Sequence, residues 1–340
     1  MATRLIMFYN YQKLLSYNAM FNFVIGERGV GKTYGALKFV VNNFLNKKEQ
    51  FIYLRRYKTE LPSNVEKLFG KLIKNEEFGE HEVTLVKNKD SCTIKIDGEI
   101  AGYCIPLSTS LILKSNDFSD VKTIIYDEFI IEKSAYHYLQ NEVHHLLEFV
   151  ETVGRLRDIR VLFLGNAVQK ANPYFNYWNL DVGYNTEYKT FKDGLILVNY
   201  IKNLEYRAAK RASRFGRLID GTEYGAYAID NKFLHENQTF IEKHDGHAKF
   251  FFILKINGRN IGIWSSTVNG KVYFSNKYDD KCPVIYTTST EDHNENTTLI
   301  RARNSTFLLT IIEKYRQGLV CFENQNIKAL VLPILNKYCN

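Results

Sequence analysis

The sequence predicts an α/β protein with a larger N-terminal part built on a parallel sheet and a smaller α+β part after it. In the first 200 residues, short apolar runs alternate with helix-like segments, as they do where crossover helices connect parallel strands. A glycine-rich loop joins the first apolar run to the first of these helices. Towards the C-terminus, strand-like runs follow one another across Asn-Gly pairs, which are typical of hairpin turns.

The N-terminal elements are predicted from the length and periodicity of the apolar segments. Residues 141–153 show a helical pattern, because apolar side chains recur every three or four positions. Short apolar runs bounded by turn residues predict strands, and Asp97-Gly98 predicts a tight turn after a hairpin. We expect strands at 21–25, 51–54, 82–86, 92–96, 102–107, 121–126 and 160–164, and helices at 34–45, 63–73 and 141–153.

A basic stretch with several glycines separates the two parts. Residues 202–217 contain six basic side chains and the single acid Glu205, and Gly216, Gly221 and Gly225 indicate turns. We therefore expect a first domain at 1–198, a linker subdomain at 199–230 and a C-terminal domain at 231–340. In the C-terminal domain we expect strands at 239–241, 250–256, 260–264 and 272–274, and helices at 296–317 and 326–338.

Composition limits the classes of protein to which the chain can belong. Apolar residues make up 45% and charged residues 24%, as in globular proteins, and no apolar run approaches the roughly 20 residues of a membrane-spanning helix. The N-terminus lacks the layout of a signal peptide, and the five scattered cysteines indicate a reducing compartment rather than a disulfide framework or a zinc site. Residues 201–340 carry 20 basic and 14 acidic residues, which indicates either a polyanionic partner or simply solubility.

Residues 26–33 read Gly-Glu-Arg-Gly-Val-Gly-Lys-Thr and match the phosphate-binding pattern G-x-x-x-x-G-K-[ST]. The pattern follows a predicted strand and opens a predicted helix, which is where backbone N–H groups and a helix N-terminus can surround phosphates. We expect Lys32 to contact the β- and γ-phosphates of a nucleotide and Thr33 to bind Mg²⁺. The predicted nucleotide contacts in this segment are Gly26, Glu27, Arg28, Gly29, Val30, Gly31, Lys32, Thr33 and Tyr34.

Two adjacent acids, Asp127 and Glu128, follow the strand predicted at 121–126. Together with an upstream phosphate loop they predict the second half of the nucleotide site, where Asp127 binds Mg²⁺ and Glu128 orients the attacking water. A glutamate in this role also indicates a sheet with an added strand between the two strands that carry these motifs. Signalling GTPases usually orient the water with a glutamine instead, and the guanine-recognition motif Asn-Lys-x-Asp does not occur in residues 1–198, so we expect ATP rather than GTP.

Two further candidates lie at the ends of later elements. Asn166 follows the strand predicted at 160–164, where a polar side chain can face the γ-phosphate, although an Asn that caps a loop explains it as well. Arg155 follows the predicted helix 141–153 and is placed to reach the site of a neighbouring subunit and stabilise transition-state charge. Arg157 is the second candidate for this role, and a solvent-exposed basic turn is the alternative for both. The predicted catalytic residues are thus Lys32, Glu128 and Arg155.

Positive charges at two other places predict contact with DNA phosphates or a part in coupling. Arg55, Arg56 and Lys58 come directly after the second strand, and Lys114 lies in a polar loop before the strand that carries the acids. Lysine and arginine in such places bind the nucleic-acid backbone without reading its sequence. A solvent-exposed surface is the alternative.

Taken together, these residues resemble the genome-packaging ATPases of phi29-like podoviruses, small members of the terminase-related, additional-strand phosphate-loop family. The similar segments are 23–33, 51–58, 126–130 and the long, unusual run 214–225, Arg-Phe-Gly-Arg-Leu-Ile-Asp-Gly-Thr-Glu-Tyr-Gly. The resemblance covers most of the chain. It places the trans-acting arginine on Arg155, and the DNA-proximal or coupling charges on Arg55, Lys58 and Lys114.

The resemblance implies a homomeric ring, a pentamer, that binds the portal of an empty procapsid and drives double-stranded DNA inward with ATP and Mg²⁺. It implies action in the host cytoplasm, absence from the mature virion and no involvement of a membrane. In some members of the family the ring also docks onto a structural packaging RNA. The C-terminal domain is expected to resemble an RNase H-like nuclease that has lost its catalytic acids.

The residues themselves leave other functions open. A two-metal nuclease needs clustered carboxylates, and the C-terminal aspartates do not obviously converge. These are Asp230, Asp245, Asp279, Asp280 and Asp292. A nuclease-active large terminase and a nucleotide-dependent nucleic-acid-binding switch are the main alternatives, and a helicase is a weaker one. The adenine contacts are also open, since Tyr9, Tyr11 and Gln12 fit either a base contact or a packed N-terminal strand.

Overall fold

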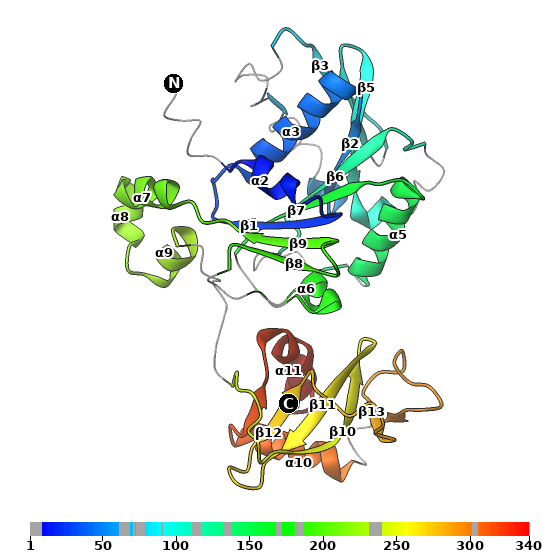
Figure 1. The fold of residues 1–340 in the computed structure, drawn as a ribbon, viewed down its shortest axis with the longest axis vertical. Helices are drawn as coiled ribbons and strands as arrows, with labels where there is room; N and C mark the ends of the chain where they lie inside the picture. The colour runs from blue at the N-terminus through cyan, green and yellow to red at the C-terminus, as the bar shows by residue number, and fades with distance from the viewer. Residues whose placement is uncertain are drawn as a thin grey trace. The chain divides into compact units, whose positions relative to one another are not determined.

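The chain divides into two units, each with its own hydrophobic core (Figure 1). The first unit comprises Met1–Gln169 and Val182–His235, and the second comprises Lys170–Asp181 and Glu236–Asn340. The segment 199–230 therefore belongs to the first unit by its contacts. The computed structural model describes residues 9–60, 69–70, 72, 79–89, 91–110, 117–131, 138–139, 141–167, 172–180, 182, 186–230, 240–300 and 305–339.

A nine-stranded, mostly parallel sheet forms the centre of the first unit, with the strand order β3-β4-β5-β2-β6-β7-β1-β9-β8. The five central pairings from β5 to β9 are parallel, whereas β3–β4, β4–β5 and β8–β9 are antiparallel. The strands are β1 (Phe21–Gly26), β2 (Gln50–Arg55), β3 (Val83–Lys87), β4 (Cys92–Ile96), β5 (Glu99–Pro106), β6 (Val121–Asp127), β7 (Arg160–Asn166), β8 (Tyr188–Phe191) and β9 (Ile196–Tyr200).

The order of the central strands brings the sequence motifs to one edge of the sheet. β7 lies between β1 and β6, with Asp127 in register with Leu164, so the added strand predicted from the sequence is confirmed. Parallel strands that run side by side end at the same edge. The carboxyl ends of β1, β2, β6 and β7 therefore bring together the phosphate loop, Arg55, Asp127 and Asn166.

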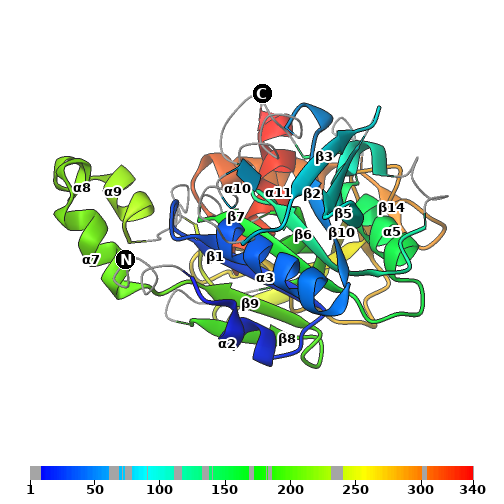
Figure 2. The ribbon, with the colours of Figure 1, turned by 90° about the horizontal axis from the view of Figure 1, so that it is seen from above.

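Helices α3 (Lys32–Lys47) and α5 (Glu142–Gly154) cover opposite faces of this sheet (Figures 1 and 2). Successive side chains of a strand point to opposite faces, and β6 shows both. Ile125 belongs to the hydrophobic core that includes α3, whereas the hydroxyl of Tyr126 donates a 2.8 Å hydrogen bond to Oε1 of Glu142 in α5. Cover on both faces explains why the central strands are continuous apolar runs.

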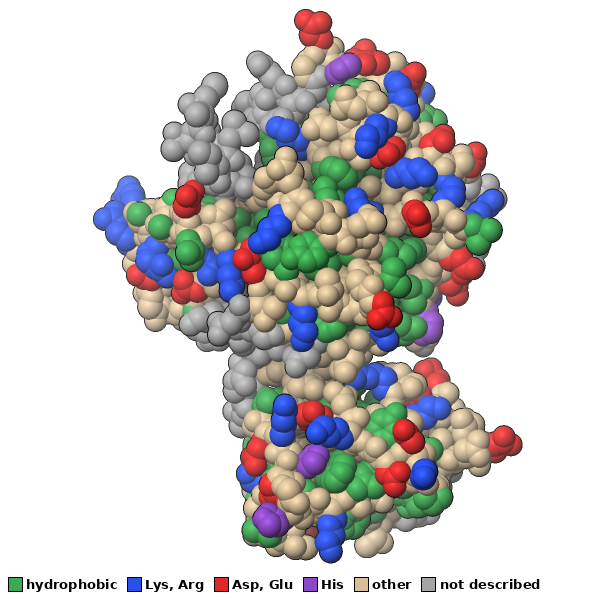
Figure 3. Space-filling model, in the orientation of Figure 1, with side chains coloured by type: hydrophobic (Ala, Val, Ile, Leu, Met, Phe, Trp, Pro, Cys, Tyr) green, Lys and Arg blue, Asp and Glu red, His purple; other side chains and the backbone are tan. Residues whose placement is uncertain are grey.

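Three short helices occupy the segment that the sequence predicted as a glycine-rich linker. They are α7 (Leu204–Ala212), α8 (Arg214–Ile219) and α9 (Glu223–Ala228). Each begins after an N-cap side chain that accepts a hydrogen bond from the backbone N–H three residues later, and these caps are Asn203, Ser213 and Thr222. Figure 3 shows Lys and Arg side chains gathered over these helices, and Arg214 and Arg217 are exposed there.

A six-stranded mixed sheet with the order β14-β13-β10-β11-β12-β15 forms the second unit, together with helices α6, α10 and α11. Strands β10 to β12 are an antiparallel meander, and the remaining pairings are parallel. The α+β class predicted for this part is confirmed. The elements are α6 (Pro173–Trp178), β10 (Lys249–Ile256), β11 (Arg259–Ser265), β12 (Val272–Ser275), β13 (Ile285–Thr287), β14 (Thr298–Leu299), α10 (Thr306–Arg316), β15 (Val320–Phe322) and α11 (Gln325–Cys339).

The predicted strands and helices are largely confirmed, with ends that move by up to three residues. The helix expected from residue 296 is an exception, because it begins only at Thr306, after the N-cap Ser305, and β14 precedes it. The N-terminal aromatic segment begins a helix, α2 (Tyr11–Ser16), and not a strand. Most of the helix predicted at 63–73 lies outside the described residues. Of the strand predicted at 239–241, Ile241 forms only an isolated parallel bridge with Phe322, and residue 239 lies outside the described residues. In the part of the chain that is described, no helix has the length and apolar character to cross a bilayer.

Candidate nucleotide-binding site

The phosphate loop, residues 26–33, connects the end of β1 to the first turn of α3. Gly29 and Gly31 both have φ of +87°, a backbone conformation that other residues rarely adopt. The loop can therefore curl, and the unpaired backbone N–H groups at the N-terminus of the 16-residue α3 can point at an anion held within it.

The side chain of Lys32 lies inside the loop and is 8% exposed. Its Nζ donates hydrogen bonds of 2.9 Å to the backbone oxygens of Gly26 and Glu27 and to Oδ1 of Asn166. The ammonium group is thus held at the tips of β1 and β7, where the phosphates of a nucleotide would lie.

The N-terminal aromatic residues brace the loop from one side. The N–H of Tyr9 donates to the carbonyl of Val30 at 2.9 Å, and the hydroxyl of Tyr11 donates to the carbonyl of Lys32 at 2.8 Å. Tyr11 is buried, and burial raises its pKa, so the hydroxyl stays a donor at neutral pH. These contacts give both tyrosines a structural role in fixing the loop.

Thr33 and Asp127 form the part of the site that fits a divalent cation. The Thr33 hydroxyl donates to both carboxylate oxygens of Asp127, at 3.2 and 3.1 Å. A hydroxyl and a carboxylate at the open end of a phosphate loop are hard oxygen ligands of the kind that Mg²⁺ takes beside nucleotide phosphates. Both residues predicted as Mg²⁺ ligands therefore lie together.

Asp127 is 7% exposed, and neighbouring side chains compensate for its burial. The Tyr53 hydroxyl donates to Oδ2 at 2.8 Å, and Nη1 of Arg55 lies 3.7 Å from the same oxygen. Burial raises the pKa of Asp127, and the Arg55 guanidinium opposes this rise. The negative charge of the carboxylate is therefore stabilised by neighbouring side chains rather than by solvent.

Glu128 lies at the edge of the site with an exposed side chain, 60% accessible. Its φ is +57°, and its backbone N–H donates to Oδ1 of Asp127 at 3.1 Å, so the chain turns sharply after β6. Nη2 of Arg55 donates to Oε2 of Glu128 at 2.7 Å. The carboxylate is therefore beside the predicted Mg²⁺ ligands but paired with an arginine.

The structure places Arg55 and Arg56 away from any surface that DNA could reach. Arg55 is 5% exposed and contacts the two acids of the site, and Arg56 is 3% exposed and forms a two-point ion pair with Glu142. Arg56 also donates to the carbonyl of Phe129 at 2.7 Å. The prediction that these side chains contact DNA phosphates disagrees with this arrangement, because both guanidinium groups are buried against carboxylates.

The two candidates for a trans-acting arginine differ in their surroundings. Arg155 follows α5 with φ of +50°, and its side chain is exposed. Arg157 instead donates hydrogen bonds to the carbonyls of Phe118, Ser119 and Val153 within its own chain. Of the two, Arg155 has the exposed side chain that a trans-acting role requires, and this role stays a prediction.

The remaining predicted residues are less closely tied to the site. Lys58 is exposed in a short 3₁₀ turn, η1 (Lys58–Glu60), as a DNA-contacting residue must be. Tyr34 packs against the hydrophobic core. Lys114 lies outside the described residues.

Two aspartates of the C-terminal unit, Asp245 and Asp292, accept hydrogen bonds from nearby residues. Asp292 accepts hydrogen bonds from the backbone N–H groups of Asn257 and Gly258 at the β10–β11 turn, and Asp245 accepts from Asn269. Within the described ranges, no group of three or more His, Cys, Asp or Glu side chains could hold a metal ion.

Sequence reasoning missed several residues of the site. Tyr53 and Glu142 bind its charged groups, but a Tyr in an apolar strand and a Glu in the first turn of a helix carry no motif. Three residues of α7 also contact the phosphate loop: Tyr206, Arg207 and Lys210. The sequence predicted this segment only as basic.

These features define a phosphate-loop nucleotide-binding protein with an added central strand and a second α+β unit. The sequence matches the family of podovirus DNA encapsidation proteins (Gp16) over residues 4–339, and the chain belongs to this family.

Comparison with individual proteins agrees with this assignment. The chain is 40% identical over 333 residues to a DNA packaging protein of Bacillus phage phi29, covering 97% of this chain and 98% of that protein. It is similar to a chain of the bacteriophage phi29 genome packaging motor assembly, with a TM-score of 0.77, 40% identity and 98% and 99% of the two chains covered. It is also similar to the crystal structure of the N-terminal domain of the phi29 DNA packaging ATPase, with a TM-score of 0.53, 42% identity and 58% and 98% covered.

Proposed function

We propose that this protein hydrolyses ATP and uses the reaction to move double-stranded DNA into a preformed procapsid through the portal. The observation that carries the proposal is the convergence of Lys32, Thr33, Asp127 and Glu128 at one edge of the sheet, in a chain of the DNA encapsidation family. The phi29 relatives, a DNA packaging protein and a chain of the genome packaging motor assembly, support the same role.

In the proposed reaction, Lys32 exchanges the loop carbonyl oxygens for phosphate oxygens. Thr33 and Asp127 hold Mg²⁺, which neutralises phosphate charge when bound. Asn166, now bonded to Lys32, lies where it can respond to loss of the γ-phosphate. Glu128 orients the attacking water, and for this its carboxylate must leave Arg55.

We further propose that the site is completed by a neighbouring subunit in a ring, a homopentamer. The exposed Arg155 of one subunit supplies positive charge to the γ-phosphate of the next. Lys58 and Lys114 are the proposed contacts with the DNA backbone, so binding should depend weakly on sequence and should fall as salt rises. Portal binding, a packaging RNA as a further partner, action in the host cytoplasm and absence from the mature virion belong to the same proposal.

A mixed-subunit ATPase measurement on procapsids tests the shared site. Glu128→Gln should bind ATP but lose about 10² to 10⁴ in turnover, because the water is no longer oriented by a base. Arg155→Ala should lose about 10³ to 10⁵ in turnover. Mixing the two variants should restore part of the activity, because one subunit then has an intact Glu128 and its neighbour an intact Arg155.

Three outcomes would contradict parts of the proposal. If Lys32→Ala binds ATP as well as wild type, the proposed nucleotide site is wrong. If Arg155→Ala hydrolyses ATP at the normal rate in the assembled ring, Arg155 does not act on the site of a neighbouring subunit. Rapid cleavage of plasmid DNA that needs a divalent metal but no ATP would favour a nuclease-active terminase, whereas DNA-stimulated turnover without movement against load would favour a switch.

A further inference from the structure

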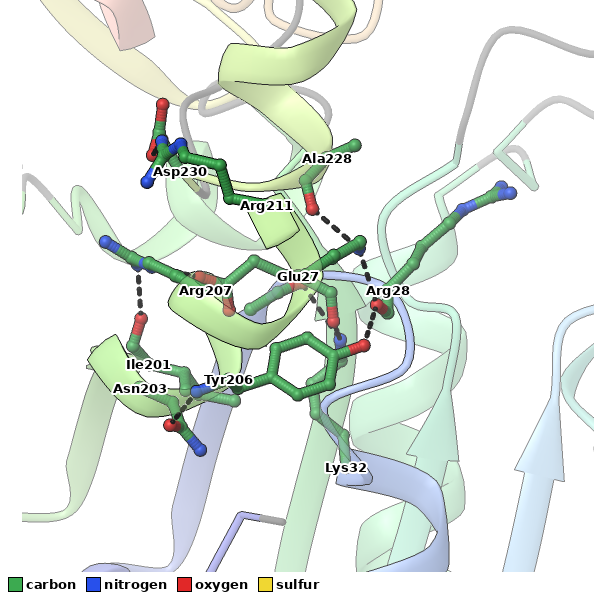
Figure 4. A network of polar contacts seen from close by, with 12 residues as sticks. Glu27, Arg28, Lys32, Ile201, Asn203, Tyr206, Arg207, Arg211, Ala228 and Asp230 are labelled. Carbon is green, nitrogen blue, oxygen red and sulfur yellow. Dashed lines mark hydrogen bonds and ion pairs between the residues drawn. The ribbon is translucent and has the colours of Figure 1, made fainter. Parts of the chain in front are cut away.

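Helix α7 lies against the phosphate loop, and three of its residues contact the loop (Figure 4). We call Tyr206, Arg207 and Lys210 the α7 clamp. Lys210 follows Tyr206 by four residues and Arg207 by three, so the three side chains leave the helix on one side. They hold the second and third residues of the loop, Glu27 and Arg28.

Glu27 is an unusual charge for a loop that is to hold a triphosphate. Its side chain is fully buried, and among the described residues no donor lies within hydrogen-bond distance of its Oε2. Its Oε1 forms an ion pair with Nε of Arg207. A buried carboxylate without a cation is unfavourable and repels phosphate charge, so Arg207 decides whether the charge of Glu27 is neutralised.

Arg207 is itself fixed in place. Its Nη2 donates at 3.0 Å to the carbonyl of Ile201, the residue after β9, and its side chain is only 18% exposed. The N–H of Ile201 in turn donates to the carbonyl of Ile25 in β1 at 2.8 Å. The guanidinium therefore connects the loop carboxylate to the sheet, and its position does not depend on a flexible surface contact.

The other two residues of the clamp act on the backbone of the loop. The Tyr206 hydroxyl and Nζ of Lys210 both donate to the carbonyl of Arg28 at 3.0 Å, and Nζ of Lys210 also reaches the carbonyl of Ala228 in α9 at 2.7 Å. At Gly29 a Cβ atom would lie 2.5 Å from the Tyr206 oxygen. The close approach of α7 thus adds a second reason for glycine at this position.

We infer that Arg207 is a positioning residue for nucleotide binding: it neutralises Glu27 and so keeps the phosphate loop electrostatically open to a triphosphate. The inference rests on the proposed ATP site but goes beyond its motif, because Arg207 lies 175 residues after Lys32 and outside the loop. Arg207 does not contact the phosphates in this proposal. Its role is to neutralise the carboxylate of Glu27, which is part of the loop.

A charge role and a purely structural role predict different double variants. If Arg207 cancels the charge of Glu27, then Arg207→Ala alone should weaken Mg²⁺·ATP binding about 10- to 100-fold, the effect of leaving a buried charge unpaired. Removing both side chains, Glu27→Ala with Arg207→Ala, should then return the Kd to within about threefold of wild type. If Arg207 only holds α7 against the loop, the double variant should bind Mg²⁺·ATP as weakly as the single variant does.

The experiment is calorimetric titration of Mg²⁺·ATP into the full-length protein. Arg211→Ala is the matched control, because Arg211 lies on the same helix but pairs with Asp220 and Asp230 and not with the loop. Its Kd should stay within about twofold of wild type. Arg207→Gln, with and without Glu27→Gln, gives a milder pair that decides the question if the alanine variant does not fold. The paired variant should again bind better than the single one.

Unchanged Kd in Arg207→Ala and Arg207→Gln, or a double variant that fails to recover, overturns the inference and leaves the ATP site intact. The proposed function fails separately, if wild type does not bind Mg²⁺·ATP or if Lys32→Ala binds it equally well. Turnover adds a second readout: KM should rise in Arg207→Ala while kcat changes little, because the residues that act on water and the γ-phosphate are untouched.

Discussion

Asp127 and Arg55 form a charge pair on which the geometry of the candidate site depends. Asp127 is buried, and burial raises the pKa of its carboxyl group. Arg55 opposes that rise and at the same time holds Glu128 through its second terminal nitrogen. One guanidinium therefore compensates the charge of Asp127, the proposed Mg²⁺ ligand, and holds Glu128, which is proposed to orient water.

We predict that Arg55→Ala lowers ATP turnover by at least about 100-fold and the free energy of unfolding by about 3–5 kcal/mol. The first effect follows from the loss of charge and position at two acids, and the second from a buried carboxylate left without its cation. Steady-state hydrolysis and urea denaturation measure the two effects. Lys47→Ala, at the exposed C-terminal end of α3, is the control and should leave both values near wild type. Turnover at the wild-type rate in Arg55→Ala would contradict this account.

At the scale of elements, Arg56 and Glu142 join three parts of the first unit. Arg56 directly follows β2, and Glu142 is the first residue of α5. Nε and Nη2 of Arg56 donate hydrogen bonds to the Glu142 carboxylate at 2.7 and 3.0 Å. Glu142 also accepts from the Tyr126 hydroxyl and the backbone N–H of Leu139. The buried carboxylate of Glu142 thus accepts four hydrogen bonds, which hold α5 against β6, the strand that carries Asp127.

We predict that Glu142→Gln lowers the free energy of unfolding by about 3–5 kcal/mol, because the buried Arg56 loses its charged partner. Chemical denaturation followed by circular dichroism measures this loss. Glu99→Gln is the matched control, since Glu99 pairs with Lys48 on the surface with both side chains at least 60% exposed. Such a pair contributes about 0–1 kcal/mol. Equal losses in the two variants would show that the Arg56–Glu142 pair is not a structural connection.

Elements that bury an apolar face could be predicted from the sequence, and elements held by polar contacts could not. The central strands and α5 have continuous or periodic apolar residues, and they were predicted. Helix α7 has no buried residues, and four of its nine residues are charged, so the segment was predicted only as a basic stretch. Its N-cap Asn203, together with Ser213 and Thr222, was the available signal, but caps alone are weak without a periodic segment behind them.

The site divides in the same way. Lys32, Thr33, Asp127 and Glu128 belong to local patterns whose chemistry is known, so their positions followed from the sequence. The burial of Arg55 beside Asp127 depends on β2 lying next to β6, which is a fact of strand order and not of any segment alone. For the same reason Arg55 and Arg56, which the sequence predicted to contact DNA or take part in coupling, are buried in the structure.

At the scale of the whole molecule, the chain has two separate hydrophobic cores. The first is built around α3 and the central strands, and the second around β10–β12, β15, α10 and α11. The second unit also takes in α6, where Nη1 of Arg259 donates to the carbonyl of Asn176 at 2.6 Å. Because the nucleotide site lies wholly in the first unit, bound nucleotide should stabilise that unit and not the second.

We predict two calorimetric unfolding transitions, of which only one moves to higher temperature with Mg²⁺·ATP. A ligand at 100 times its Kd adds about 2.7 kcal/mol to the unit that binds it. Phe322→Ala, at a fully buried position in the second core, should lower the other transition through a loss of about 3–5 kcal/mol and leave the Kd for Mg²⁺·ATP unchanged. Phe163→Ala, equally buried in β7, is the counterpart that should lower the nucleotide-sensitive transition. If instead a single transition responds to the ligand and to both substitutions, the two cores unfold as one cooperative unit, and stabilisation by nucleotide at the phosphate loop extends through the whole chain.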